Sequence, residues 1–457
     1  MESFNRIKKY SQTVCDQIRW KKAHAYIAEE IENHIIDQRD AYIGQGMSED
    51  QAMDETISQM GDPVAVGAQL DSTHRPKPQW GMIFLTFTLL CMGLFINTYF
   101  LNVTYSDNPG KIVSSMFIGI GLMLIAYLID FTFIGKYPVL LYFSIVFGGA
   151  VTLILSPQYN GRAYYGMYFA LLFPVAFAAI IYWLRNKGYI GIIFCGIAFM
   201  LPAGITLMVP TVSGFVLLTI TGLVLLSIAI AKNLFKINKI AGYILVFLPT
   251  FFTLCFAAIQ SLYRWSERIT IAFNPSLDPY GMGWQSMVAR ALLDNSKFIG
   301  SGTMPAQYSG EKYFPLPGID TDFMLTYLIF KVGWIGFFII MAVLMFFIIT
   351  GFVHCLKQKS ILGALVSTSV MMTFTLQVIG YVISNLGFQL LSPISLPLIS
   401  FGSTAMIINL VLIGIMLSVF RNGDIVRDKN DVRYKKDRFI TWCDGKIIIT
   451  LRKKPVS

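Results

Sequence analysis

Apolar runs dominate the sequence from Trp80 to Phe420, and most are long enough to cross a lipid bilayer. A membrane-spanning helix needs about 20 mainly apolar residues and satisfies its own backbone hydrogen bonds. The chain is 55% hydrophobic and only 14% charged, which excludes an ordinary soluble domain. We therefore predict an all-α polytopic membrane protein with about ten transmembrane helices. The expected spans are 80–101, 112–131, 137–156, 164–184, 189–209, 213–231, 240–260, 323–352, 362–384 and 402–420, and a re-entrant helix is the alternative near 323–352 and 385–401.

The basic residues indicate how these spans are oriented. Lys and Arg gather in alternate short loops and in the tail, whereas the opposite short loops carry little beyond Lys111 and Arg162. Cytoplasmic loops are the ones enriched in Lys and Arg. We therefore expect a multi-pass protein of the cell membrane, with both termini cytoplasmic and a large extracellular loop at 261–321 between the seventh and eighth helices. This distribution also accounts for the net charge of +10 without a nucleic-acid partner.

The polar N-terminus, residues 1–78, is typical of a small helical module. An isoleucine at every fourth position from Ile27 to Ile35 forms the apolar stripe of one helix, and Ser48 and Asp62 are N-cap signals for two more. The pattern resembles the helical permease-prefix-like domain that precedes several membrane-protein families in Gram-positive bacteria. This resemblance implies a regulatory or protein-binding role. It rests on the stretch EEIENHIIDQRDAYIGQGMSEDQAMDETISQMGDPVAVGAQL.

The expected outer loop ends in Leu316-Pro317-Gly318-Ile319-Asp320-Thr321-Asp322-Phe323, where the chain is predicted to return to lipid. An ionised group in the bilayer costs several kcal/mol, so polytopic proteins keep acids away from this boundary unless they use them. Two carboxylates at the end of a long loop therefore indicate chemistry at the membrane surface. A structured lid without chemistry is the alternative.

Glycine turns precede this acidic segment. Asp278-Pro279 is followed by Gly281-Met282-Gly283, and Gly300-Ser301-Gly302 comes later. Such residues let the backbone bend sharply and approach a ligand closely. Between the two turns, Trp284 to Leu293 has the pattern of an amphipathic helix in the membrane interface, with Trp284 and Met287 in lipid and Arg290 directed away from it.

A second unusual stretch, residues 391–403, has two prolines and several small polar residues before the last span. Irregular backbone at membrane depth is tolerated only where protein buries it or where it lines a wet cavity. We therefore expect a buried or cavity-lining segment here, and a plain surface loop is the alternative.

Together these motifs resemble the SEDS family (shape, elongation, division and sporulation), the FtsW/RodA/SpoVE glycosyltransferases of peptidoglycan synthesis. The resemblance covers about residues 80–421 and is concentrated in the second half. The family pattern is a Pro, Asp-Pro, Gly-x-Gly-Tyr-Gln, Gly-x-Gly and Leu-Pro-Glu-x-His-Thr-Asp-Phe, and later Pro-Leu-Pro-Phe-Ile-Ser-Tyr-Gly-Gly-Ser. This chain has, in the same order, Pro275, Asp278-Pro279, Gly281-Met282-Gly283-Trp284-Gln285, Gly300-Ser301-Gly302, Leu316-Pro317-Gly318-Ile319-Asp320-Thr321-Asp322-Phe323 and Ser395-Leu396-Pro397-Leu398-Ile399-Ser400-Phe401-Gly402-Ser403-Thr404.

The chain also departs from the family pattern. Gly318 and Asp320 stand where the family has Glu and His, and Lys331 stands where it has an acidic pair. Only Pro174 remains of the family's Gln-Pro-Ser-Glu. These departures leave room for a divergent activity, a different lipid substrate or no catalysis. Asp322, however, matches the family's essential aspartate, which argues against simple decay of the site.

The resemblance implies polymerisation of lipid II, the undecaprenyl-diphosphate-linked disaccharide, by inverting transfer. A single displacement needs a base for the attacking hydroxyl and positive charge on the departing diphosphate. Asp322 is the candidate base, and its expected place at the lipid boundary would raise its pKa by desolvation. Asp320 is a helper rather than a second base, because side chains two residues apart diverge.

Cations and polar groups of the loops are candidates for contact with the substrate. Arg268 is favoured for the diphosphate, since a guanidinium forms bidentate bonds to oxyanions. No set of metal ligands is visible in the sequence, but a divalent cation (Mg²⁺ or Mn²⁺) bridging the diphosphate stays open, because it needs no protein cage. The other candidate substrate-binding residues are Arg264, Asp320, Trp284, Gln285, Lys312 and Ser400; Arg290 and Lys297 are further loop cations.

The family's usual partner is a single-pass class B penicillin-binding protein, so the resemblance implies this partner too. A flippase for the lipid-linked precursor and a non-catalytic scaffold for the penicillin-binding protein are the alternative functions. The expected domains are a cytoplasmic helical prefix domain at 1–78, a membrane domain at 79–421 and a cytoplasmic basic tail at 422–457. Asp444-Gly445 predicts a hairpin turn within that tail.

Overall fold

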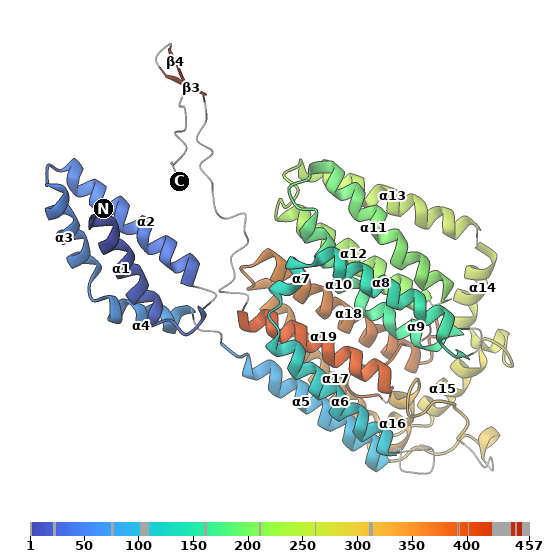
Figure 1. Ribbon diagram of the computed structural model, residues 1–457. Helices are drawn as coiled ribbons and strands as arrows, with labels where there is room; N and C mark the ends of the chain where they lie inside the picture. Colours follow the sequence, from blue (N-terminus) through green and yellow to red (C-terminus); the bar gives the residue numbers. More distant parts are fainter. Residues whose placement is uncertain are drawn as a thin grey trace.

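The computed structural model describes residues 2–21, 24–74, 77–100, 109–159, 162–209, 212–260, 262–309, 314–390, 392, 394–400, 402–422, 440–443 and 446–449. In this part of the chain, helices form a compact bundle with a smaller group of N-terminal helices beside it (Figure 1). Two short antiparallel strand pairs are the other regular structure. These are β1 (Gln158–Tyr159) with β2 (Arg162–Ala163), and β3 (Ile440–Cys443) with β4 (Lys446–Ile449).

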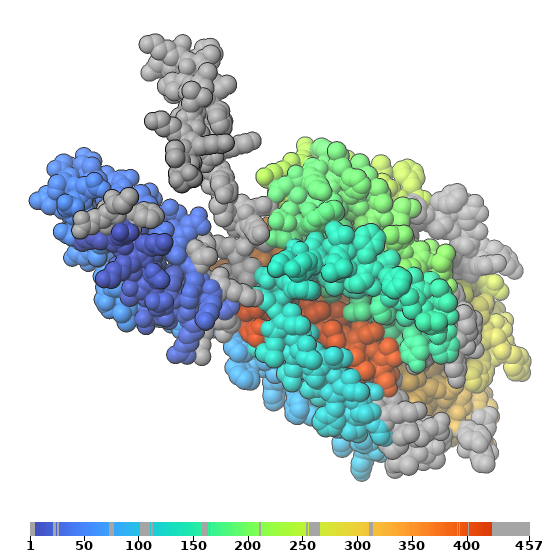
Figure 2. Space-filling model, viewed as in Figure 1, coloured from blue at the N-terminus to red at the C-terminus, as the bar shows by residue number. Residues whose placement is uncertain are grey.

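The N-terminal group contains α1 (Glu2–Asp16), α2 (His24–Gly44), α3 (Glu49–Met60) and α4 (Pro63–His74), drawn in blue in Figures 1 and 2. The predicted isoleucine stripe of α2 is buried in a core of its own, together with Val14 of α1 and Met53 of α3. The predicted caps are also present, since the Ser48 side chain accepts from the N–H of Gln51 and Asp62 accepts from that of Ala65. Helix α1, which the cap signals did not predict, supplies the other side of this core.

Ten apolar segments of the bundle correspond to the ten expected spans. Within the described residues, eight of these are long and apolar enough to cross a membrane, and two shorter apolar helices take the places of the second and seventh spans. The prediction of an all-α polytopic membrane protein is therefore confirmed. The helices of the bundle and its loops are α5 (Trp80–Phe95) continued by the π-helix η2 (Ile96–Phe100), α6 (Pro109–Leu128), α7 (Thr132–Lys136), α8 (Pro138–Leu155), α9 (Tyr164–Phe169), η3 (Ala170–Leu172), α10 (Phe173–Trp183), α11 (Gly188–Met208), α12 (Val212–Ala231), α13 (Lys239–Gln260), α14 (Leu262–Phe273), η4 (Pro275–Leu277), α15 (Trp284–Asp294), η5 (Ala306–Tyr308), α16 (Met324–Val332), α17 (Trp334–Leu356), α18 (Ile361–Asn385) and α19 (Ser403–Asn422).

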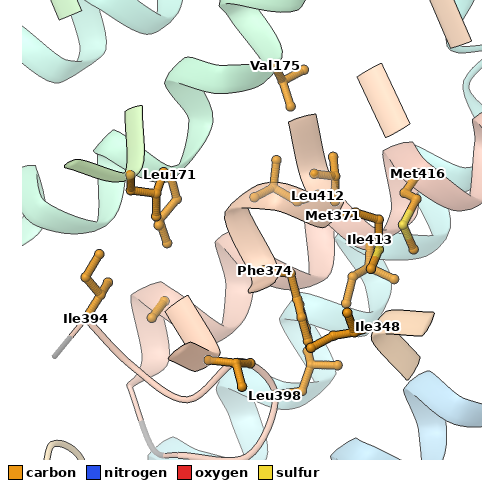
Figure 3. Packing of buried hydrophobic residues seen from close by; sticks show 14 of the residues in the cluster. Leu171, Val175, Ile348, Met371, Phe374, Ile394, Leu398, Leu412, Ile413 and Met416 are labelled. Atoms are coloured by element: carbon orange, nitrogen blue, oxygen red, sulfur yellow. The ribbon is translucent and has the colours of Figure 1, made fainter. Parts of the chain in front are cut away.

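Helices α10, α18 and α19 form the centre of the bundle, where most of their residues are buried. Figure 3 shows Met371 and Phe374 of α18 close to Ile413 of α19 and Ile348 of α17. Helix α6 lies very close to α19 at Gly414. A Cβ on this glycine would lie only 2.4 Å from the carbonyl oxygen of Met123. Small residues at helix contacts permit such close packing inside a membrane, where no hydrophobic effect drives helices together.

The predicted single span at 323–352 is wrong, because the chain breaks at Gly333, whose φ of +100° is strained for any side chain. The break divides it into α16 and α17. The N–H of Gly300 donates to the carbonyl of Val332 (2.8 Å), and the N–H of Trp334 donates to that of Lys297 (3.1 Å). The loop before α16 therefore caps both helix ends at the break. Helix α16 is buried in the bundle, and the candidate membrane span begins at Trp334.

Candidate active site

The segment with the two carboxylates forms a tight turn from Gly318 to Phe323. Gly318 has a φ of +62°, and its carbonyl accepts from the N–H groups of Thr321 (3.1 Å) and Phe323 (2.9 Å). Ile319 and Phe323 are buried in the core of the bundle. The turn is thus anchored by apolar side chains, while the side chain of Asp322 stays exposed to solvent.

Tyr381, fully buried near the end of α18, fixes the backbone on both sides of Asp322. Its hydroxyl donates to the carbonyl of Thr321 (2.7 Å) and accepts from the N–H of Met324 (3.2 Å). The N–H of Met324 belongs to the first turn of α16, where backbone donors have no partner within the helix. A side chain from α18 therefore caps α16 and holds the Asp322 turn at the same time.

Asn385, one helical turn further along α18 and equally buried, completes this clamp. Its Nδ2 donates to the carbonyl of Asp322 (2.9 Å), and its Oδ1 accepts from the N–H of Thr326 (3.0 Å). The hydroxyl of Thr326 donates back to the carbonyl of Asn385 (2.7 Å). We refer to Tyr381 and Asn385 together as the α18 clamp.

The two carboxylates of the turn differ in their environments. Asp320 is half-buried, and burial raises the pKa of its carboxyl group. Hydrogen bonds from its own backbone and from Thr321 lower the pKa, but burial has the larger effect. The expected desolvation of Asp322 is wrong, because its side chain is exposed and α16 separates it from the span that begins at Trp334. An exposed carboxylate on a fixed backbone can take a proton from a bound substrate without the turn having to rearrange.

The first glycine turn is shaped around Asp278. The Asp278 side chain accepts from the N–H of Met282 (2.7 Å), and a Cβ on Gly283 would lie 2.1 Å from the carbonyl oxygen of Pro275. In the second turn, a Cβ on Gly302 would meet Phe330 of α16 at 2.9 Å. Both glycines thus have a packing role, and approach of a ligand to these turns stays a prediction.

The predicted helix from Trp284 is confirmed as α15, but its surroundings differ from those expected. Its apolar face is buried, with Val288, Ala289 and Leu292 in the same core as α16, so this face is not in the membrane interface. Trp284 is 38% exposed and Gln285 is half-buried on the first turn. Substrate contact by these two residues stays a prediction.

The loop cations fall into two groups. Arg268 is exposed on α14, and Lys297 is exposed after α15. Arg290 points inward rather than outward, and three backbone carbonyls occupy its guanidinium. The prediction that Arg290 is available to bind the diphosphate is therefore wrong. The side chain of Arg264, and Lys312 as a whole, lie outside what the structure describes.

Ser400 lies in an irregular segment, 394–400, that is buried along its whole length. Its hydroxyl accepts from the N–H of Leu396 (2.9 Å) and donates to the same residue's carbonyl (3.2 Å). The segment packs on α5 and η2: Gly93 of α5 has no room for a side chain, and Asn97 of η2 donates to the carbonyl of Ile399 (3.0 Å). The expected burial of this segment is confirmed, and contact between Ser400 and substrate stays a prediction.

The α18 clamp was not predicted from the sequence, although a signal was present. Ser369, Thr373, Gln377, Tyr381 and Asn385 recur at every fourth position and form a continuous polar stripe on an otherwise apolar span. All five are buried, and Gln377 exchanges hydrogen bonds with Asn409 of α19. Buried polar groups need partners, so such a stripe points to specific contacts within the bundle.

Comparison with known proteins agrees with this architecture. Trichlorobacter lovleyi has a probable peptidoglycan glycosyltransferase FtsW that is 24% identical over 164 residues, which are 36% of this chain and 42% of that protein. Bacillus subtilis has a stage V sporulation protein E that is 27% identical over 155 residues, 34% of this chain and 42% of that protein. The matched segments thus span less than half the length of these curated relatives.

Solved structures share the fold. A chain from a peptidoglycan synthase complex, described for its coordination of polymerization and crosslinking, superposes with a TM-score of 0.59 and 17% identity, covering 77% of this chain and 99% of that one. The rod shape determining protein RodA of Thermus thermophilus superposes with a TM-score of 0.51 and 14% identity, covering 76% of this chain and 97% of that one.

The family model named for FtsW, RodA and SpoVE, with the description "Cell cycle protein", matches residues 80–424. That range includes every helix from α5 to α19. The chain therefore belongs to the FtsW/RodA/SpoVE family of cell cycle proteins.

Proposed function

We propose that this protein is a peptidoglycan glycosyltransferase that polymerises lipid II into glycan strands. Family membership supports the substrate class and the reaction. The single observation that carries the assignment to a site is the exposed carboxylate of Asp322 on a turn that the α18 clamp holds from both sides. Asp322 is also the residue that matches the family's essential aspartate.

In the proposed reaction, Asp322 is the general base. Its carboxylate takes the proton from the C4 hydroxyl of one N-acetylglucosamine as that oxygen attacks C1 of the N-acetylmuramic acid of another chain. The bond from C1 to the diphosphate oxygen breaks, the diphosphate leaves with the electron pair, and the configuration at C1 inverts. General-base catalysis of this kind contributes about 10²- to 10⁴-fold in rate.

The departing diphosphate needs positive charge. Arg268, exposed on α14, is the proposed ligand among the described cations, with Arg264 and Lys312 as further candidates. A divalent cation held by the diphosphate would share this role, since Mg²⁺ commonly binds through substrate phosphates and one or two carboxylates. The carboxylates of the turn that would help to hold such an ion are Asp320 and Asp322.

The same proposal includes the orientation and the partner. Both termini would be cytoplasmic and the region from α14 to α16 extracellular, because the basic residues gather on the opposite side. Residues 1–78, 79–421 and 422–457 would act as prefix domain, membrane domain and tail. A single-pass class B penicillin-binding protein would be the partner, in keeping with the shared fold of the synthase-complex chain.

The test is polymerisation of purified lipid II by the protein in proteoliposomes, with wild type beside Asp322→Asn and Asp294→Asn. Asp294 is an exposed acid on α15 and serves as a matched control for loss of a charge. We expect strands from wild type and Asp294→Asn, and a loss of at least about 100-fold in Asp322→Asn. If folded wild type makes no strands, with or without the penicillin-binding protein, the proposed glycosyltransferase function is wrong. Translocation of the labelled precursor in the same vesicles would then favour a flippase.

A further inference from the structure

The guanidinium of Arg290 connects three separate parts of the outer region. Its Nε donates to the carbonyl of Gly387 (3.1 Å), its Nη1 to that of Phe273 (2.9 Å) and its Nη2 to that of Ala272 (2.6 Å). The same group lies over the ring of Phe388, 4.6 Å from the ring centre. All three nitrogens of the guanidinium are thus used within the protein.

The first of these parts is the end of α14. Ala272 and Phe273 are the last two residues of this helix, and the last four carbonyls of a helix have no partner within it. A cation is also favoured at this end by the helix dipole. Arg290 of α15 therefore acts as the carboxyl-terminal cap of α14, and the edge-to-face contact of Phe273 with Phe388 reinforces the same junction.

The second part is the turn after α18. Gly387 has a φ of +85°, and a Cβ there would lie 2.6 Å from Cγ of Arg290. The position thus requires glycine for two reasons: its backbone conformation has a positive φ, and the stem of Arg290 fills the space that a side chain would need. Gly387 follows Asn385 of the α18 clamp by two residues. Arg290 therefore binds the turn after α18 next to the group that fixes the Asp322 turn.

Arg290 therefore joins the helix that carries Arg268 to the helix end that holds Asp322. We propose that Arg290 is a positioning residue, which sets the distance between α14 and the Asp322 turn so that base and diphosphate ligand face one substrate. The proposal rests on the proposed function. A lysine cannot replace it, because one ammonium does not present donors in the planar fork that reaches three separate carbonyls.

The kinetic test compares Arg290→Ala and Arg290→Lys with wild type and Asp294→Asn in lipid II polymerisation. Misplacement of a catalytic group by about 1 Å can cost about 100-fold in rate. We expect kcat to fall about 10- to 100-fold in both Arg290 variants while KM changes by less than about threefold. Asp294→Asn should match wild type. A large rise in KM with unchanged kcat, or full rescue by lysine, would overturn the positioning role.

A distance measurement tests the same point without catalysis. Spin labels can be attached at Thr270→Cys on α14 and Lys331→Cys on α16, which are both exposed positions, after other reactive cysteines are replaced. The distance between the labels reports the spacing of the two elements in the full-length protein. Wild type and Asp294→Asn should give one narrow distribution, and Arg290→Ala a broader or shifted one. An unchanged distribution in Arg290→Ala would overturn the proposal. If wild type shows this narrow distribution but makes no glycan, the proposed function fails while the structural coupling stands.

Gly387→Ala provides a second variant in case Arg290→Ala does not fold. It keeps the arginine but places a methyl group where the Arg290 stem lies. It should therefore broaden the same distance distribution and lower kcat in the same direction. A narrow, unshifted distribution in folded Gly387→Ala would contradict the proposed coupling.

Discussion

The turn at Gly318–Phe323 and the segment at 394–400 are both shaped by buried hydrogen bonds, yet they differ in what they expose. In the turn, side chains from α18 hold the backbone and leave the Asp322 carboxylate in solvent. In the segment, the Ser400 side chain bonds to the backbone of Leu396 and every residue is buried. The contrast supports our proposal that the turn, with its exposed carboxylate on a fixed backbone, is the reaction site. The complete burial of the segment favours a packing role for it.

The largest expected effect comes from removing one hydroxyl from the clamp. Tyr381→Phe leaves the carbonyl of Thr321 and the N–H of Met324 without their buried partner. Such a loss costs about 1–3 kcal/mol of stability, and the polymerisation rate per folded molecule should also fall. Thermal unfolding in detergent and lipid II turnover measure the two effects.

The control for this variant is Tyr243→Phe, which removes a hydroxyl that donates to the carbonyl of Ser227 on another part of the bundle. It should keep full activity. Unchanged turnover in Tyr381→Phe would show that the clamp has no part in catalysis.

Gly93→Ala tests the packing of the segment at 394–400. A Cβ at this position would lie 2.6 Å from the carbonyl oxygen of Leu398, whereas one at Gly81 in the same helix meets nothing within 4 Å. Overpacking of this kind costs about 1–3 kcal/mol. The melting temperature should drop for Gly93→Ala and stay the same or rise for Gly81→Ala; equal values would mean that the close approach to α5 is not required.

Ser400→Ala separates a packing role from a substrate role. The variant loses the bond to the N–H of Leu396, which is worth about 1 kcal/mol. We expect this loss of stability with an unchanged KM for lipid II. An increase in KM at unchanged stability would instead establish the predicted contact with substrate.

The smallest effect concerns pH. Burial raises the pKa of Asp320 in the folded protein, so the folded state binds its proton more tightly than the unfolded state. The stability that this proton contributes is present below the ordinary carboxyl pKa and is lost as pH rises through the raised pKa. Asp320→Asn should remove this dependence and be slightly more stable than wild type at neutral pH. Melting curves at pH 4 to 7 test the sign, and a wild type that gains stability relative to Asp320→Asn with rising pH would contradict it.

Much of the fold follows from local patterns in the sequence. Except at 323–352, the apolar runs locate the expected spans to within a few residues, and Ser48 and Asp62 mark the starts of α3 and α4. The break at Gly333 was not predicted, because the apolar residues continue from α16 into α17. Only the hydrogen bonds from residues 297–302, more than thirty positions earlier, stabilise two separate helices there.

The candidate site shows the same limit. Asp322 was identified through its motif, but the backbone around it is held by Tyr381 and Asn385, about sixty residues later in the chain. The charge of Arg290 predicts a phosphate ligand as readily as a helix cap. Only the positions of three carbonyls from α14 and from the turn after α18 distinguish the two roles.

The most direct test of the central claim is the pH dependence of the initial polymerisation rate for wild type, Asp320→Asn and Asp322→Asn. A general base acts only in its deprotonated form, so the wild-type rate should fall on the acid side as the base becomes protonated. We predict that Asp320→Asn keeps this acid limb, whereas the residual rate of Asp322→Asn no longer shows it. An acid limb that persists in Asp322→Asn, or that disappears in Asp320→Asn, would contradict the assignment of Asp322 as the base.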